Sequence, residues 1–268
     1  MTEENSSEEN FKKTVRRKSI MPFFWFALFI SASIIGWQLL NDQPKDAGAL
    51  KPLRTVLSAN EKLFSAFYSN SRLEPEYPAS AAVRYPKVNG NYGMKSTLDT
   101  ATWKLFVVRN GDVPVTADTL TVSMDEIRSL PRTEVIFNFK CIEGWSQITR
   151  WAGVKFSDFA EHYHLGTKSG NAPDKEKQND LFKYAGLRTP DGQYYVGIDL
   201  PSIMHPQTIL CYEMNGKPLP MNQGAPLRLI IPVKYGVKHL KRIGTLFFSD
   251  AQPPDFWYER GYDYYAGL

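Results

Sequence analysis

The chain has 268 residues, of which 43% are hydrophobic and 13% aromatic, so a folded core is expected and a disordered chain is excluded. A net charge of +4, with no basic residues interleaved among the aromatic ones, gives no indication of nucleic-acid binding. Two cysteines, Cys141 and Cys211, exclude a disulfide-rich scaffold and a zinc site built mainly from thiolates, and there is no CxxCH motif for covalent haem.

The first predicted element is an uncharged apolar segment, residues 20–40, which as a helix is long enough to cross a bilayer at about 1.5 Å per residue. Five basic residues precede this segment, and the next basic residue after it is Lys45. This asymmetry predicts a cytoplasmic segment at residues 1–19, a single membrane-spanning anchor at 20–40 and an outward-facing remainder. The pair Arg16-Arg17 is typical of a twin-arginine export signal, but it fits an ordinary basic flank equally well.

Residues 41–85 are expected to form a tether and an extended arm. The stretch 41–58 is predicted to be a polar tether. Residues 60–70, "NEKLFSAFYSN", predict a short amphipathic helix, with apolar residues on one side that are Leu63, Phe64, Phe67 and Tyr68. Residues 71–100 are rich in proline and lack periodicity, which predicts an extended arm lying over the domain.

A folded domain is predicted for residues 86–268. Strands are expected at 103–108, 133–140, 181–187, 194–199, 207–214, 227–233 and 242–248. Short helices are expected at 123–130, where Ser123 and Glu126 form a capping box, and at 154–164, with Ser157 near the start. A solvated loop at 166–180 and an aromatic tail at 256–265 complete the domain. Since strands outnumber short helices, the prediction is an α+β fold with a mixed, barrel-like sheet.

Cys141 lies at the end of a predicted strand, in "KCIEGWS". A thiolate there, with Gly144 allowing a ligand to approach the backbone, suits a soft metal. A buried structural cysteine and a disulfide with Cys211 are the alternatives. The four histidines do not form a metal-binding set, and no G-x-S-x-G elbow indicates a hydrolase.

A second candidate site is the basic loop that follows the turn at Gly224. Arg228 lies on the predicted strand, and the basic residues after it are Lys234, Lys238, His239, Lys241 and Arg242. Such a loop suits the phosphate of a cofactor, although a solvated basic loop would look the same. There is no Walker or dinucleotide-binding pattern.

Three segments, "KCIEGWS…RWAGV", "DLPSIMHPQTIL" and "NGKPLPMNQGAPLRLIIPVKYGVKHLKRI", occur in an order that resembles the molybdopterin-binding domain of the sulfite oxidase superfamily. The resemblance covers roughly residues 86–257 and is strongest to the bacterial branch that contains the catalytic subunit of periplasmic protein-methionine-sulfoxide reductase.

The resemblance implies a molybdenum–molybdopterin cofactor (Mo-MPT) with Cys141 as the catalytic metal ligand and Glu143 as an acid or solvent organiser. The residues that it implies for binding the pterin are Asn89, Tyr92, Gly93, Thr189, Gln223, Arg228, His239, Leu240 and Lys241. Two positions depart from the family pattern: Gln223 replaces an asparagine, and Lys140 replaces an arginine that is the better bidentate anion binder.

The expected function is therefore two-electron oxygen-atom transfer, in the direction of reducing a sulfoxide or related oxide, by an enzyme anchored in the bacterial inner membrane and facing the periplasm. A haem-containing membrane subunit is the expected electron partner, and the substrate is an oxidised small molecule or a protein-bound group. Because this cofactor is inserted in the cytoplasm, folded export by the twin-arginine route is favoured. The alternative is a non-catalytic binding protein that retains the fold.

Overall fold

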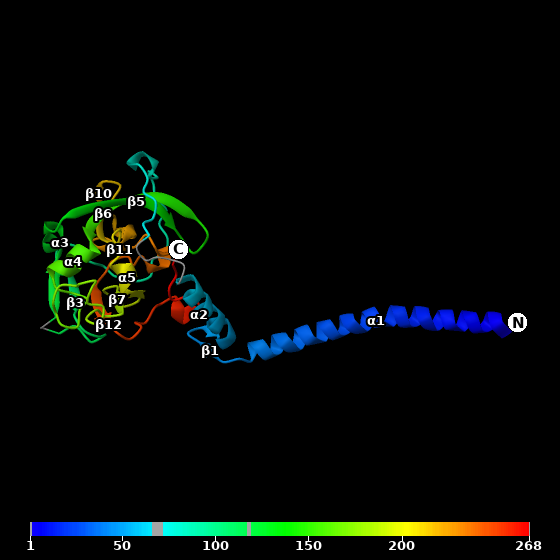
Figure 1. The fold of residues 1–268 in the computed structure, drawn as a ribbon. Coiled ribbons are helices and arrows are strands. Elements are labelled where there is room, and N and C mark those ends of the chain that lie inside the picture. The colour runs from blue at the N-terminus through cyan, green and yellow to red at the C-terminus, as the bar shows by residue number, and fades with distance from the viewer. Residues whose placement is uncertain (1, 66–71, 117–118, 268) are drawn as a thin grey trace.

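The computed structural model describes the backbone of residues 2–65, 72–116 and 119–267, and the side chains of 11–63, 72–116 and 119–267. Figure 1 shows a folded domain from which one long helix projects. This helix, α1 (Thr2–Asn41), contains a segment at Phe11–Asn41 that is long and apolar enough to cross a membrane, and none of it is buried in the protein.

The segment that follows α1 is folded, so the prediction of a polar tether at 41–58 was wrong. Strands β1 (Lys45–Asp46) and β2 (Ala49–Leu50) form a small antiparallel hairpin, and α2 (Lys51–Ser65) follows directly. The helix predicted at 60–70 therefore begins earlier than expected, and its predicted part at 66–70 lies outside the described residues.

Two five-stranded sheets form the domain. The first has the order β4-β3-β12-β7-β8 and consists of β3 (Lys104–Val108), β4 (Leu120–Ser123), β7 (Tyr184–Arg188), β8 (Tyr195–Asp199) and β12 (Thr245–Ser249). Its strands pair antiparallel except for β12 and β3, which pair parallel. The predicted mixed sheet is confirmed.

The second sheet is antiparallel and carries the longest strands. It has the order β10-β9-β6-β5, with β11 paired to β9, and consists of β5 (Arg132–Lys140), β6 (Ser146–Lys155), β9 (Ile209–Met214), β10 (Lys217–Pro218) and β11 (Arg228–Ile230). In Figure 1 the β5–β6 hairpin lies along one side of the domain, and β3, β7 and β12 lie on the other. Neither sheet closes into a barrel within the described residues, which corrects the barrel-like description.

The helices of the domain are short. The α-helices are α3 (Met124–Ser129), α4 (Phe156–His162) and α5 (Leu200–Ile203). The 3-10 turns are η1 (Ala79–Ala81), η2 (Met221–Gln223), η3 (Gly236–Lys238) and η4 (Tyr258–Arg260). The predicted capping box of α3 is confirmed, since Ser123 and Glu126 each bind the other's backbone N–H. Helix α4 has no side-chain cap, so Ser157 does not start it as expected; the Ser157 hydroxyl contacts Asp158 instead.

The largest hydrophobic cluster joins both sheets to the helices. Leu105 and Ile198 of the first sheet and Val154 and Leu210 of the second are each at most 1% exposed within it. A smaller cluster around Phe137 packs on the second sheet near the end of β5. Burial of this size holds both sheets rigidly, so the loops at their ends are positioned by a fixed scaffold.

The predicted arm lies on the second sheet. The backbone N–H of Tyr77 donates to the carbonyl of Ile136, and that of Val83 donates to the carbonyl of Ile148. The arm then runs past Lys87, whose N–H donates to the side chain of Gln147, toward the end of the β5–β6 hairpin. This placement brings residues near 90 next to Cys141, about fifty positions further along the chain.

Candidate active site

Cys141 opens the loop of the β5–β6 hairpin. Its N–H donates to the carbonyl of Trp145 (2.9 Å), and the N–H of Gly144 donates back to the carbonyl of Cys141 (3.0 Å). Gly144 adopts a φ of 87°, which a residue with a side chain rarely does. The tight loop fixes the thiol at the strand end, where it is only 6% exposed.

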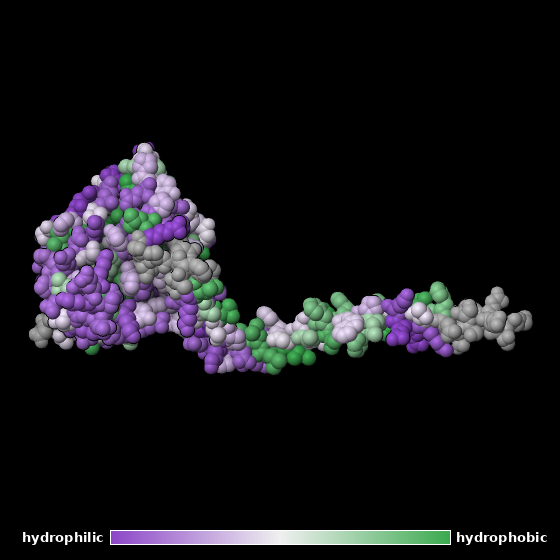
Figure 2. Space-filling view, viewed as in Figure 1, coloured by the Kyte–Doolittle hydropathy of each residue, from purple (hydrophilic) through white to green (hydrophobic). Residues whose placement is uncertain are grey.

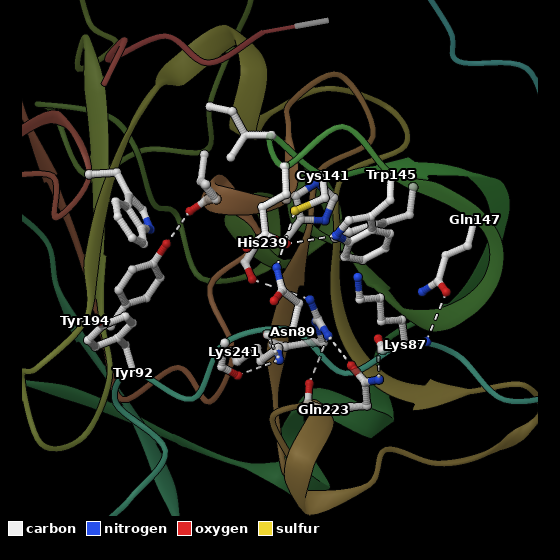
Figure 3. A pocket seen from close by; sticks show the side chains of 18 of the residues that line it. Lys87, Asn89, Tyr92, Cys141, Trp145, Gln147, Tyr194, Gln223, His239 and Lys241 are labelled. Atoms are coloured by element: carbon white, nitrogen blue, oxygen red, sulfur yellow. Dashed lines mark hydrogen bonds between the residues drawn. The ribbon is translucent and has the colours of Figure 1, made fainter. Parts of the chain in front are cut away.

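The thiol faces a cavity of about 250 Å³. Eight of the eleven residues that the sequence implicated line it: Asn89, Tyr92, Cys141, Glu143, Gln223, Arg228, His239 and Lys241. In Figure 3, Asn89 and Lys241 lie in the middle of the view, between Trp145 on one side and Tyr92 with Tyr194 on the other. The site therefore combines segments that are distant in sequence.

Arg228, on β11, is a buried cation for which the described residues provide no carboxylate partner. Its guanidinium donates to the backbone and side-chain oxygens of Gln223 (2.9 and 3.1 Å) and lies 4.6 Å from the ring centre of Trp151. Its Nε has no hydrogen-bond partner, and burial lowers its pKa to about 10. A buried cation in this state is strongly stabilised by an anion, so the cavity is suited to an anionic ligand.

His239 presents a free acceptor at the same cavity. Its Nε2 is 3.1 Å from the carbonyl of Lys234, which can only accept, so Nε2 carries the proton. Burial, with a smaller contribution from the positive charge of Arg228, lowers the pKa of His239 to about 3, so the imidazole is neutral. Its Nδ1 is buried without a partner and is available to an N–H or O–H donor on a ligand.

Lys241 and Asn89 connect the basic loop to the arm. The Lys241 ammonium donates to the carbonyls of Asn89 and Gly90, and burial followed by the charge of Arg228 lowers its pKa to about 7. The amide of Asn89 donates to the sulfur of Cys141 at 3.4 Å. Asn89 therefore contacts the thiol directly, in addition to any contact that it makes with a pterin.

Glu143 lies at the mouth of the cavity and accepts a hydrogen bond from the indole N–H of Trp145 at 3.0 Å. This hydrogen bond, together with a second and weaker contribution from a hydrogen bond with Asn89, lowers the pKa of the Glu143 carboxyl, which is therefore ionised at neutral pH. Of the two roles considered for Glu143, an acceptor that organises solvent and the Trp145 ring agrees with this environment better than a proton donor.

Three predicted residues do not line the cavity. Gly93 has a φ of 68°, and a Cβ there would lie 2.3 Å from the methyl group of Thr189. The Thr189 hydroxyl donates to Asp191 and accepts from the N–H of Tyr194, so it already has partners within the protein. Leu240 is fully buried, and its N–H and carbonyl already bond to Lys238 and Leu229. Cofactor contacts by these three residues stay predictions.

Only part of the predicted basic cluster reaches the site. Lys234 pairs with Asp199 at 2.9 Å, and Lys238 pairs with Asp255 at 2.5 Å. Arg242 donates to backbone carbonyls of the arm. These three cations stabilise the fold, which corrects the expectation that the whole loop faces a phosphate.

Several lining residues were not anticipated. They share aromatic or polar character and come from the arm, the β5–β6 hairpin, the β7–β8 connection and the tail: Lys87, Phe139, Trp145, Gln147, Trp151, Tyr194, Trp257 and Tyr262. Of these, Trp145 and Trp151 lie in the segment that carried the family resemblance, and the aromatic content of the tail was the one further signal in the sequence.

The two cysteines are free in the structure, so the proposed alternative of a Cys141–Cys211 disulfide was wrong. Cys211 is fully buried on β9, and burial raises the pKa of its thiol to about 12. It is a core residue, as predicted, and Cys141 is left as the thiol that faces the cavity.

A cavity that joins the Cys141 thiol to a buried cation without a carboxylate partner and to an unpartnered imidazole nitrogen fits an anionic organic cofactor that carries a soft metal. Together with the α+β fold of two sheets, this defines a molybdopterin-binding oxidoreductase. Residues 92–257 match the family described as the oxidoreductase molybdopterin binding domain, and the chain belongs to this family.

One curated relative agrees with this assignment. The chain is 31% identical over 202 residues to a protein of Azospira oryzae whose name describes a candidate protein-methionine-sulfoxide reductase subunit, YedZ1, and the match covers 75% of this chain and 70% of that one. It also resembles the crystal structure of the sulfane dehydrogenase SoxCD from Paracoccus pantotrophus, with 17% identity and a TM-score of 0.45. That match covers 59% of this chain and 40% of the other. The chain is an oxidoreductase of the sulfite oxidase superfamily whose cofactor is molybdenum–molybdopterin.

Proposed function

We propose that the enzyme reduces a sulfoxide or a related oxide, with Cys141 as the protein ligand to molybdenum. Arg228, His239, Lys241 and Gln223 would hold the pterin and its phosphate, because these side chains present the unpaired cations and the free acceptor of the cavity. The name of the Azospira oryzae relative supports a protein-bound methionine sulfoxide as the first substrate to test.

When bound, the cofactor supplies two-electron oxygen-atom transfer at the metal. The overall reaction converts a sulfoxide, two electrons and two protons into a thioether and water. The protein's own residues then have three tasks: Cys141 holds the metal at the strand end, Asn89 orients the sulfur, and the aromatic walls limit access of water. Glu143 stays ionised and would orient solvent at the mouth.

The observation that carries this proposal is the charge at the mouth of the cavity. Lys140, the residue before Cys141, is turned away from the cavity and pairs with Glu74 at 3.3 Å. Arg228 and Lys241 also line the cavity, but in this proposal they bind the anionic groups of the cofactor. The two other charged lining residues, Glu143 and Lys87, have opposite signs, and the Lys87 ammonium lies 4.6 Å from the ring centre of Trp145. A mouth with balanced charges and apolar side chains favours a neutral sulfoxide over the sulfite anion.

The test is a direct comparison of the two reactions with the full chain purified from a host that makes the molybdenum cofactor. Reduction of protein-bound and free methionine sulfoxide is followed with a reduced viologen dye, and oxidation of sulfite is followed with ferricyanide. We expect sulfoxide reduction and little sulfite oxidation, with Cys141→Ser inactive. Sulfite oxidation faster than sulfoxide reduction would overturn the proposal. Lys140→Met serves as the matched control, because it removes a cation outside the cavity and should leave both rates unchanged.

We further propose that residues 20–40 anchor the enzyme in the inner membrane, with the domain at 86–268 in the periplasm. The exposed apolar helix and the basic residues before it support this arrangement. The enzyme would be exported folded, with Arg16 and Arg17 as the signal, because the cofactor is loaded before transport. In cells, the double variant Arg16→Lys, Arg17→Lys should accumulate on the cytoplasmic side; unchanged export would exclude the twin-arginine route.

Electrons would come from a haem-containing membrane subunit, because the chain has no covalent haem motif and only two cysteines. Co-purification of a b-type haem with the enzyme from native membranes, and reoxidation of that haem when sulfoxide is added, would support this partner. Haem that stays reduced while sulfoxide is consumed would exclude it.

A further inference from the structure

Helix α2 is amphipathic, but its exposed apolar residues lie on the side that faces away from the domain. Its apolar residues Leu53, Val56 and Leu63 point away from the domain and are 52%, 55% and 55% exposed. These three residues recur at spacings of three and seven, which places them on one side of a helix. Figure 2 shows apolar residues at the surface where the domain meets α1. We call Leu53, Val56 and Leu63 the outer face of α2.

The inner side of α2, which carries Arg54, the partly buried Leu57 and Glu61, is fixed to the domain. Arg54 is 5% exposed and donates to the carbonyls of Ala47, Tyr258 and Tyr262 at 2.7–3.0 Å. Its guanidinium also lies 4.1 Å from the ring centre of Tyr258. Two turns further on, Glu61 is half-buried close to the domain. The helix therefore cannot rotate to bury its outer face without breaking these contacts.

Helix α2 also starts very near the end of α1. The β1–β2 hairpin folds the connection back on itself, and the N–H of Lys51 donates to the carbonyl of Pro44 at 2.9 Å. Pro44 is only three positions after Asn41, a distance of at most about 11 Å along an extended chain. The interfacial layer of a bilayer is roughly 5–8 Å thick on each side of the apolar core.

From this geometry we infer that α2 lies in the headgroup layer of the membrane, with its outer face toward the acyl chains. This inference rests on the proposed anchoring of α1. If α1 spans the bilayer and ends at its surface, the start of α2 is held within reach of the headgroups. The exposed charges of this stretch balance, since Lys45 and Lys51 are offset by Asp42 and Asp46, so the apolar outer face carries the interfacial contact.

Lipid, rather than a second copy or another protein, covers the outer face, because only a short stretch of chain joins α2 to the membrane anchor. The membrane anchor and α2 belong to the same short stretch of chain, so every molecule that is anchored brings its own α2 to the surface. The interfacial contact would hold the domain at a fixed orientation, since Arg54 links α2 to the tail that contributes Trp257 and Tyr262 to the cavity.

The inference is tested with the full chain in nanodiscs of phosphatidylethanolamine and phosphatidylglycerol. Nitroxide labels are placed singly at Val56→Cys and Leu63→Cys, at Ser33→Cys in α1, and at Asp125→Cys on the exposed surface of α3. Both native cysteines are buried, and unsubstituted protein carried through the same labelling reports any background. Collision rates of each label with oxygen, which enriches in lipid, and with a water-soluble nickel chelate are then compared.

We expect the oxygen-to-nickel ratio at 56 and 63 to exceed that at 125 by about threefold or more, and to be lower than that at 33, as for a helix at the boundary of the acyl region. Labels at 56 and 63 that behave like 125, while 33 is in lipid, would overturn the inference and leave the anchor intact. Aqueous behaviour at 33 as well would overturn both. Low accessibility of 56 and 63 to both reagents would show that protein covers the face, and dipolar broadening would identify a second copy; either result overturns the inference.

Discussion

The Arg54 contacts allow a quantitative test of how the C-terminal tail is held. In Arg54→Met the side chain keeps its apolar length but loses donors to Ala47, Tyr258 and Tyr262. A hydrogen bond from a charged donor contributes about 1.5–3 kcal/mol, and the released carbonyls regain water in part. We therefore expect the tail to lose about 3 kcal/mol of local stability, with the ring contact to Tyr258 adding to the loss.

The assay is amide hydrogen exchange of the tail, followed by mass spectrometry of a peptide that spans residues 256–264. The N–H of Gly261 and that of Tyr262 are protected by short bonds within the tail, to Tyr258 and Trp257. A loss of about 3 kcal/mol corresponds to roughly 100-fold faster exchange if these amides exchange by local opening.

Two controls accompany this experiment. Arg54→Lys keeps the charge but not the planar fork, and should give an intermediate rate. Arg109→Met removes two similar bonds to the carbonyls of Tyr163 and His164, far from the tail, and should leave the tail unchanged. Exchange at the wild-type rate in Arg54→Met would refute the reasoning, because aromatic packing alone would then hold the tail.

Three further predictions concern the cavity and the core. The pKa of Lys241 falls from 10.5 to about 7 on folding, so the unfolded chain binds more protons between these pH values and cofactor-free protein should gain stability as pH rises from 7 to 10. In urea unfolding, Lys241→Met should reduce the slope of stability against pH by up to about 1.4 kcal/mol per pH unit. An unchanged slope would contradict the assignment. Asp255→Asn leaves the buried Lys238 without its counter-charge and should lower the free energy of unfolding by about 3–5 kcal/mol, measured as a lower melting temperature. The exposed Asp125→Asn should lower it by less than about 0.5 kcal/mol. Equal effects of the two variants would be evidence against a role for the Lys238–Asp255 pair. Gly93→Ala forces a positive φ on alanine and drives its methyl group into Thr189, so we expect a loss of at least about 2 kcal/mol and less bound molybdenum by mass spectrometry. Gly90 has a similar φ of 67° but no neighbour within 4 Å, so Gly90→Ala carries the backbone strain without the clash and should retain more metal. Equal metal content in both would rule out the close approach as the cause.

The parts of the site that could be predicted lie in short, chemically distinctive segments. Cys141 at a strand end and Arg228, His239 and Lys241 around a basic loop were identified because residue type and order carried the family pattern. Their grouping in one cavity agrees with that interpretation. The pattern could not predict which way each basic side chain points. Lys234 and Lys238 form ion pairs with carboxylates that come from a distant strand and from the tail.

Among the elements that were not predicted, two were missed for identifiable reasons. Strand β6 was not predicted, because Gly153 interrupts its β-branched and aromatic pattern. The structure requires glycine there, since a Cβ would lie 2.0 Å from the carbonyl of Leu210 on β9. The early turns of α2 were taken as a tether, because the helix packs on the domain through Arg54 and leaves Leu53 and Val56 exposed, the reverse of the usual rule. Neither feature is visible without the neighbouring chain.

The cavity takes its walls from the arm near Asn89, the hairpin at Cys141, the basic loop at Lys241 and the tail at Tyr262. These segments are separated by up to about 170 positions, so the cavity closes through contacts of long sequence separation, which form slowly and late in folding. During synthesis its last wall is absent until residue 262 has been added to the growing chain. A cofactor that needs every wall can therefore be retained only by a chain whose translation has passed this point.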